Sequence, residues 1–171
     1  MITAICPGSY DPVTLGHVDV ITRAARVFDR VVVGVVREPR HKQTMFTVEE
    51  RVAFLVEALT QLDNVEVDVF HELVVDFARR WGASAMVKGL RVVSDFEWEF
   101  QMNHLNRVLA PEIETVYVMA SPEVSFVSSS GVKEIAHFGG RVDELVPEPV
   151  ARRFRELFPD GQPGAPLSPQ E

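Results

Sequence analysis

A segment near the start of the chain combines the residue types that bind phosphate. Residues 7–17 read Pro-Gly-Ser-Tyr-Asp-Pro-Val-Thr-Leu-Gly-His and run into a helical pattern. Glycine lets the backbone approach a ligand closely, and the N–H groups at the start of a helix form a natural anion site. His17, in the first helical turn, can donate a hydrogen bond to a phosphoryl oxygen, although the same residues also suit a tight turn with a capping histidine. The segment fits neither the G-x-G-x-x-G fingerprint nor the P-loop pattern.

Three later segments are basic or rich in hydroxyl groups. They read Arg-Glu-Pro-Arg-His-Lys at 37–42, Lys-Gly-Leu-Arg at 88–91 and Ser-Phe-Val-Ser-Ser-Ser-Gly at 125–131. Each alone also fits a solvated loop or a serine helix cap. All three lysines of the chain, however, fall in or beside these segments: Lys42, Lys88 and Lys133. If the segments meet in space, they form a cationic, donor-rich cleft suited to a phosphorylated ligand.

The hydrophobic pattern predicts how these segments are positioned, because strands and helices alternate along the chain. Apolar runs predict strands at 2–6, 31–36, 64–70, 83–87 and 115–119. Helical spacing predicts helices at 16–28, 47–59, 73–81, 94–109, 128–138 and 147–158. Strict alternation predicts an α/β fold, a single domain with a doubly wound five-stranded parallel sheet. Ligands of such sheets bind outside the carboxyl ends of the strands, where the four segments fall.

Composition excludes several classes of protein. The 171 residues include 17 basic and 25 acidic ones, a formal net charge of −8, which argues against a non-specific nucleic-acid binder. The single cysteine, Cys6, allows no intrachain disulfide and suits a reducing compartment. No apolar run approaches the roughly 18 residues of a membrane span, and the N-terminus lacks a signal-peptide pattern. We therefore expect a cytoplasmic protein without membrane or nucleic-acid partners.

Residues 8–17 resemble the [HT]-x-G-H motif of the nucleotidylyltransferase superfamily. The first motif position is Thr14, as in the bacterial phosphopantetheine adenylyltransferases. The resemblance continues through four more segments: 45–51, 88–91, 95–99 and 125–130. It implies a Rossmann-like nucleotidyltransferase domain over 1–158. The remaining 159–171, with four prolines and two glycines, is expected to be a disordered Pro-rich tail.

The resemblance implies reversible transfer of the adenylyl group of ATP to 4′-phosphopantetheine, giving 3′-dephospho-coenzyme A and pyrophosphate. This is the penultimate step of coenzyme A biosynthesis. The resemblance also implies a cytoplasmic homohexamer, feedback inhibition by coenzyme A, and Mg²⁺ held mainly by substrate phosphates, with no metal ligands from the protein. Because the second pKa of a phosphate monoester is about 6, the acceptor is largely a dianion at neutral pH. We expect direct in-line attack with no covalent enzyme intermediate.

The resemblance assigns roles to individual residues. His17 would stabilise the transition state at the α-phosphate, and the expected catalytic group is His17, Lys42, Lys88 and Arg91. The residues expected to bind the acceptor are Ser9, Lys42, Val74 and Lys88. The residues expected to bind ATP are Ser9, Tyr10, His17, Gly89, Leu90, Arg91, Glu99, Val124, Ser125, Phe126, Val127, Ser128, Ser129 and Ser130.

Some positions depart from the family pattern. Ser9 and Lys88 stand where many relatives carry Thr and Arg, and lysine cannot make the two-pronged contact of arginine. Trp98 replaces a commoner Tyr, and Val124 offers no ring for stacking on adenine. Trp98 and Phe100 are expected to pack the helix at 94–109.

Two other functions stay open at the level of the sequence. A sister nucleotidylyltransferase, such as a pyridine-nucleotide adenylyltransferase or a cytidylyltransferase, is disfavoured by Thr14 and by the pair Lys42 and Lys88. A non-catalytic nucleotide-binding module could share the fold, since fold alone does not fix function.

Overall fold

The computed structural model describes residues 1–39 and 43–159; Lys42 and almost all of the expected Pro-rich tail therefore lie outside the described residues. Within them the chain alternates strands and helices, in the order predicted from the sequence. The elements are β1 (Thr3–Gly8), α1 (Leu15–Ala25), β2 (Arg30–Val36), α2 (Val48–Ala58), β3 (Val65–Phe70), α3 (Val74–Arg80), β4 (Ala85–Leu90), α4 (Val93–Leu109), β5 (Glu114–Met119), α5 (Ser129–His137) and α6 (Glu148–Leu157).

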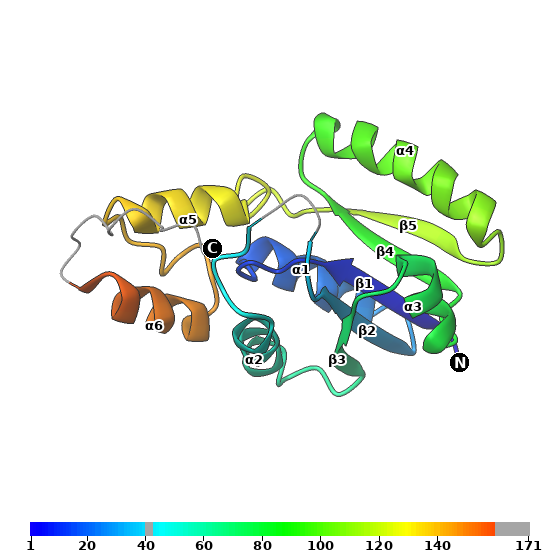
Figure 1. Cartoon of the computed structure of the whole chain (residues 1–171), viewed down its shortest axis with the longest axis horizontal. Helices are drawn as coiled ribbons and strands as arrows, with labels where there is room; N and C mark the ends of the chain where they lie inside the picture. Colours follow the sequence, from blue (N-terminus) through cyan, green and yellow to red (C-terminus); the bar gives the residue numbers. More distant parts are fainter. Residues whose placement is uncertain (40–42, 160–171) are drawn as a thin grey trace.

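The strands form one parallel sheet in the order β3-β2-β1-β4-β5, which confirms the predicted fold class. In Figure 1, α4 lies along β4 and β5, whereas α5 and α6 extend beyond one end of the sheet. The chain adds strands to one side of β1 and then crosses over to place β4 on its other side. The crevice at this reversal is the usual ligand site of a doubly wound sheet.

Two hydrophobic layers cover the sheet, and β2 contributes to both. Val31, Val33 and Val35 face the layer that includes α1, α2, α5 and α6. Val32 faces the opposite layer, which includes α3. The apolar run of five valines and a glycine at 31–36 is therefore explained by a central strand that is buried on both faces.

Strand β4 is longer than the sequence pattern predicts. The predicted strand ends at Val87 and leaves 88–91 as a loop, but β4 continues to Leu90 because its pairing with β5 extends to that residue. Lys88 therefore projects from a strand, which is a more rigid support than a loop. Gly89 is required there, since a Cβ atom would lie 2.9 Å from the side chain of Val20 in α1.

Helix α4 differs from the other helices because none of its residues is buried. The expectation that Trp98 packs the helix is wrong, since it is 64% exposed; Phe100 is 47% exposed, and its ring contacts those of Phe96 and His104 on the same helix. The helix follows the outer part of the sheet, where β5 is an edge strand and offers little depth for packing. Several apolar side chains of α4 are left exposed in this chain: Val93, Phe96, Trp98, Phe100, Leu105, Val108 and Leu109.

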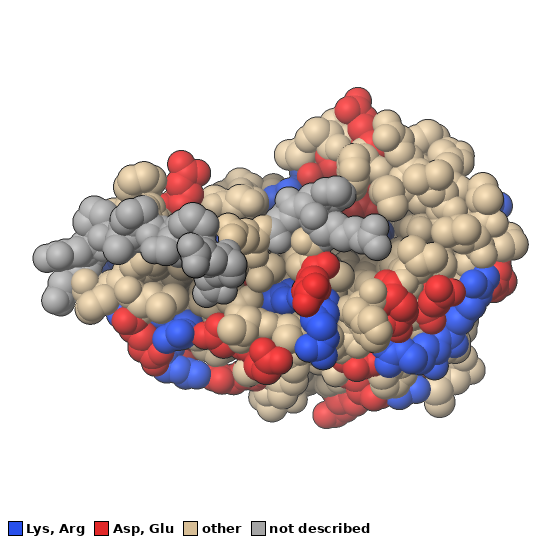
Figure 2. Space-filling model, in the orientation of Figure 1, with Lys and Arg blue, Asp and Glu red and all other residues tan. Residues whose placement is uncertain are grey.

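Charged side chains of both signs lie side by side on the face in Figure 2. Many charged side chains of the described residues are paired, as are Arg80 with Asp68 and Glu72, and Arg152 with Glu57. The excess negative charge of the chain is therefore not concentrated in one block on that face. No helix in the described part of the chain is both long and apolar enough to cross a membrane.

Gly34 in β2 provides a test of the packing under α3. A methyl group at this position would overlap the ring of Phe77, which stacks on Phe70 with ring centroids 4.7 Å apart. We expect Gly34→Ala to lower the free energy of unfolding by about 1–3 kcal/mol, the usual cost of overpacking a core. Urea denaturation measures the change. The cost should shrink when Phe77 is replaced by Leu, and an equal cost in both backgrounds would contradict the explanation.

Candidate active site

A cleft of about 430 Å³ opens at the carboxyl ends of β1 and β4. Pairing between these two strands covers only Ala4 with Ala85 and Ile5 with Met86, whereas β1 stays paired with β2 as far as Gly8. Beyond Ile5 the two strands are therefore not held together, and Pro7, which has no N–H to offer a neighbouring strand, lies in this stretch. The separation of the two strands makes the cleft.

The turn after β1 is held by its own side chains. Tyr10 is buried with a positive φ of 49°, its hydroxyl donates to the Cys6 carbonyl at 2.8 Å, and its ring meets the His17 ring edge-on. The Thr14 backbone N–H donates to Nδ1 of His17 at 3.0 Å, while the His17 N–H donates to the Thr14 hydroxyl oxygen at 3.4 Å. These two contacts form a capping box that starts α1.

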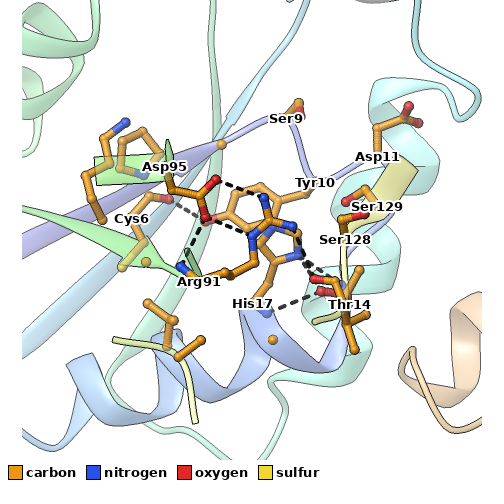
Figure 3. A pocket seen from close by; sticks show the side chains of 18 of the residues that line it. Cys6, Ser9, Tyr10, Asp11, Thr14, His17, Arg91, Asp95, Ser128 and Ser129 are labelled. Atoms are coloured by element: carbon orange, nitrogen blue, oxygen red, sulfur yellow. Dashed lines mark hydrogen bonds and ion pairs between the residues drawn. The ribbon is translucent and has the colours of Figure 1, made fainter. Parts of the chain in front are cut away.

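The capping contact also decides which ring nitrogen of His17 carries a proton. Because Nδ1 accepts from the Thr14 N–H, the proton of the neutral ring is on Nε2. His17 lines the cleft, as Figure 3 shows together with the Thr14 contact. The two interpretations of the histidine, helix cap and phosphate donor, therefore use different nitrogens of one ring and are compatible.

Each lysine or arginine lining the cleft is paired with a carboxylate. Lys88 Nζ lies 3.2 Å from Glu99, and Arg91 Nε lies 3.1 Å from Asp95, as Figure 3 shows for the second pair. Asp95 and Glu99 are one turn apart on the same face of α4. Burial opposes ionisation of Asp95, but the hydrogen bonds from Arg91 outweigh it and lower the pKa of the Asp95 carboxyl. Phosphate oxygens that enter the cleft can take the place of these carboxylates.

The start of α5 forms the wall opposite β4. Ser128 caps the helix by accepting the Gly131 N–H at 3.0 Å. The Ser129 hydroxyl donates to the Pro12 carbonyl at 2.8 Å, which ties α5 to the turn after β1. The N-termini of α1 and α5 thus both border the cleft, and two helix N-termini favour a ligand with several negative charges.

Comparison with known proteins gives a consistent result. A profile for the Cytidylyltransferase-like family matches residues 5–135. Phosphopantetheine adenylyltransferase of Synechococcus sp. (strain JA-3-3Ab) is 52% identical over 91% of this chain and 98% of its own length. The protein of the same name from Gloeobacter violaceus is 54% identical over 96% and 99%. The chain belongs to the phosphopantetheine adenylyltransferase family. The family resemblance inferred from the sequence is thereby confirmed, and with it the class of enzyme, a nucleotidyltransferase.

A solved structure from Vibrio parahaemolyticus, described as a nicotinate-nucleotide adenylyltransferase, aligns with a TM-score of 0.65. It covers 91% of this chain and 93% of its own, at 16% identity. At that identity the likeness concerns the fold alone.

The structure brings most of the residues expected from the phosphopantetheine adenylyltransferase pattern to one cleft. Those that line it are Ser9, Tyr10, His17, Lys88, Gly89, Arg91, Glu99, Val127, Ser128, Ser129 and Ser130. The others that are described lie outside its lining: Val74, Leu90, Val124, Ser125 and Phe126. Leu90 is buried at the end of β4, Val74 begins α3, and Phe126 is largely exposed. The Val124 carbonyl instead lies against Gly16 at the start of α1, 3.2 Å from where a Cβ of Gly16 would be.

Three charged residues near the cleft received no role from the sequence. Lys133 Nζ lies 2.6 Å from a carboxylate oxygen of Asp11, which also accepts the backbone N–H groups of Met45 and Phe46. Arg51 reaches the same turn from α2. Asp11 lies within the motif and Lys133 beside a recognised segment, but their contact spans 122 residues. The hydrophobic periodicity of the sequence does not predict a contact between residues so far apart in the chain.

The carboxylates near the cleft do not form a metal cage. Asp11, Asp95 and Glu99 are each tied to a different cation, and no group of three His, Cys, Asp or Glu side chains in residues 1–39 and 43–159 converges on one point.

The Cys6 thiol gives a chemical test of the cleft. Burial raises the pKa of Cys6 to about 12, although the nearby charge of Lys88 opposes this. At pH 8 its thiolate fraction would be about 10⁻⁴, compared with about one quarter for a free thiol of pKa 8.5. We expect iodoacetamide to label Cys6 at least about a hundredfold more slowly in the folded protein than in urea, as followed by mass spectrometry. Comparable rates would mean that the thiol is accessible and ionised in the folded state.

Proposed function

We propose that the protein transfers the adenylyl group of ATP to 4′-phosphopantetheine and releases pyrophosphate, with 3′-dephospho-coenzyme A as the product. The observation that carries this proposal is the match, at about 50% identity over almost the whole chain, to proteins named for this reaction. The cleft supports it physically, because two helix N-termini, His17, Lys88 and Arg91 border one space. This set suits a substrate whose charge lies on several phosphates.

The proposed chemistry needs alignment and charge stabilisation. The acceptor phosphate is already a dianion, so no base is required to make it a nucleophile. His17 then acts as a hydrogen-bond donor through Nε2 to the α-phosphate, where charge develops as the P–O bond to pyrophosphate lengthens. Arg91 and the start of α5 receive the outer phosphates, and Ser9 and Lys88 hold the acceptor phosphate. The oxygen of the acceptor attacks in line, and pyrophosphate leaves.

Magnesium enters this proposal as part of the nucleotide substrate. Mg²⁺ keeps several waters and commonly binds substrate phosphates, and it neutralises charge on them. The pairing of Asp11 with Lys133 and of Asp95 with Arg91 supports this role, since both carboxylates are already committed to protein cations.

We also propose that the protein is a cytoplasmic homohexamer inhibited by coenzyme A. Coenzyme A differs from the proposed product by one phosphate, so it can occupy the same cleft. The exposed apolar side chains of α4 support assembly, because large exposed apolar areas on a monomer often mark interaction sites.

The reaction is tested by measuring pyrophosphate release from MgATP with each of several acceptors. We expect release only with 4′-phosphopantetheine, with dephospho-coenzyme A formed in equal amount. Release with nicotinate or nicotinamide mononucleotide instead would assign the protein to a sister reaction. ATP binding without release, whatever the acceptor, would favour a non-catalytic module.

His17→Ala tests the role of the histidine. We expect kcat to fall by about 10²–10³-fold, the usual effect of losing one transition-state donor, with the Kd of ATP changed only a few-fold. The lost cap costs about 1 kcal/mol of stability, which a thermal melt reports separately. His137→Ala, at the far end of α5, is the control and should keep full activity. A large loss of ATP affinity with an unchanged kcat would contradict the assigned role.

The α4 face gives a test of assembly. Six copies of the 19.2 kDa chain weigh about 115 kDa. We expect Val108→Asp to reduce the mass measured by light scattering, because a buried unpaired carboxylate is costly at an interface. Val27→Asp is a matched control, since Val27 is 75% exposed and lies after α1, away from α4. An unchanged mass for Val108→Asp would exclude α4 from the interface.

A further inference from the structure

Arg51 in α2 is the largest fully buried side chain of the described residues, with 1% of its surface exposed. Burying a guanidinium is costly unless its N–H groups find partners. Burial lowers the pKa of Arg51, while the nearby carboxylates of Asp11 and Glu49 oppose that change. Burial of the Arg51 guanidinium therefore lowers the stability of the folded protein.

The hydrogen bonds of Arg51 all go to backbone carbonyls. Nη1 donates to Ser9 at 2.8 Å and to Val36 at 2.9 Å, and Nη2 donates to Arg37 at 2.8 Å. Nε is 3.4 Å from the Thr47 carbonyl, within its own helix start. One side chain therefore joins the turn after β1, the carboxyl end of β2 and the beginning of α2.

The contact with Ser9 orients the peptide that enters the cleft. In a trans peptide the carbonyl and the N–H point in opposite directions, so the anchored Ser9 carbonyl turns the Tyr10 N–H away from Arg51. Ser9 and Tyr10 both line the cleft. Tyr10 has a positive φ, a conformation that a non-glycine residue keeps only when its surroundings hold it.

Asp11 supports the same turn from the other direction. Its carboxylate accepts the N–H groups of Met45 and Phe46 at 3.0 and 2.9 Å, and it is 4% exposed. Two buried groups of opposite charge, Arg51 and Asp11, thus fix residues 9–11 against the segment that leads into α2.

Arg51 contacts Ser9, one of the two residues assigned to the acceptor phosphate; the other, Lys88, projects from β4. The groups assigned to the outer phosphates, Arg91 and the start of α5, follow β4 and β5 on one half of the sheet. Arg51 instead contacts the ends of β1 and β2, on the other half. It makes no hydrogen bond to α1, α4 or α5 among those of the described residues.

We propose, building on the function proposed above, that Arg51 is a positioning residue for the acceptor: by fixing Ser9 against the carboxyl end of β2, it sets the geometry in which the acceptor phosphate binds. Its loss weakens acceptor binding much more than ATP binding, because most of the residues assigned to ATP follow β4 and β5 and do not touch Arg51. The chemistry of the reacting atoms is untouched, since Arg51 is sealed from the cleft by the turn that it holds.

The test uses Arg51→Lys, which keeps the charge but cannot reach the same set of carbonyls, and Arg51→Gln, which keeps donors without the charge. The acceptor used is 4′-phosphopantetheine. The KM for each substrate is measured at saturation of the other, together with ATP affinity by calorimetry and the Tm. We expect Arg51→Lys to raise the KM for the acceptor at least about tenfold, with the KM and Kd for ATP within about threefold of wild type. Arg51→Gln should raise the KM for the acceptor further.

Phe54→Leu is the matched control, because Phe54 lies on the same helix and packs in the core without a hydrogen bond to the turn. It should lower the Tm and leave both KM values unchanged. Equal increases of both KM values in Arg51→Lys, or a lower Tm with unchanged kinetics, would overturn the positioning role. If neither variant folds at the assay temperature, the same constants are measured at a lower temperature in a stabilising osmolyte, where an unchanged KM for the acceptor would overturn the proposal. Lack of acceptor-dependent release by the wild-type protein would instead overturn the proposed function itself.

Discussion

Strand β1 hydrogen-bonds to β2 on one side and to β4 on the other, and the site depends on how unequal these two pairings are. With β2 the register runs from Thr3 to Gly8, whereas with β4 it covers only Ala4 and Ile5. A strand held firmly on one side and released early on the other gives a rigid wall beside an opening. The turn after β1 therefore starts from a fixed point, and Lys88 and Gly89 of β4 line the opening beside it.

Electrostatics inside this opening differs from that of the chain as a whole. The net charge is −8, yet Lys88, Arg91 and Lys133 converge on the cleft, each beside a carboxylate. These pairs are only partly exposed, so the carboxylates lower the cost of keeping cations in a partly desolvated space. A phosphate that enters the cleft replaces a carboxylate as the partner of a cation. It can also accept hydrogen bonds from the N–H groups at the two helix N-termini, which the carboxylates of α4 do not reach. Such an exchange favours polyphosphates over single negative charges.

Local chemistry made much of the fold and site predictable. The capping box of Thr47 and Glu50, the valine pattern of β2 and the serine cap of α5 depend on neighbours within a few residues, and all three are present. The end of β4 was predicted too early because it depends on pairing with a later strand. The exposure of Trp98 and the contact between Asp11 and Lys133 also depend on distant parts of the chain. Arg51 was missed for the same reason, since a charged residue on a helix is usually solvated and only tertiary structure places carbonyls around it.

Thr14 and His17 illustrate how one contact can satisfy folding and chemistry together. A helix start needs acceptors for its first N–H groups, and a phosphate donor needs a defined tautomer. The Thr14 N–H on Nδ1 meets both needs, because it completes the cap and leaves the proton on Nε2. The edge of Tyr10 then limits the ring's rotation, and Arg51 and Asp11 hold the turn that carries Tyr10. The Thr14 cap and the Tyr10 ring thus position the donor, within a turn whose preceding residues are held by buried charges. A site built this way is expected to lose precision before it loses its fold when those buried groups are changed.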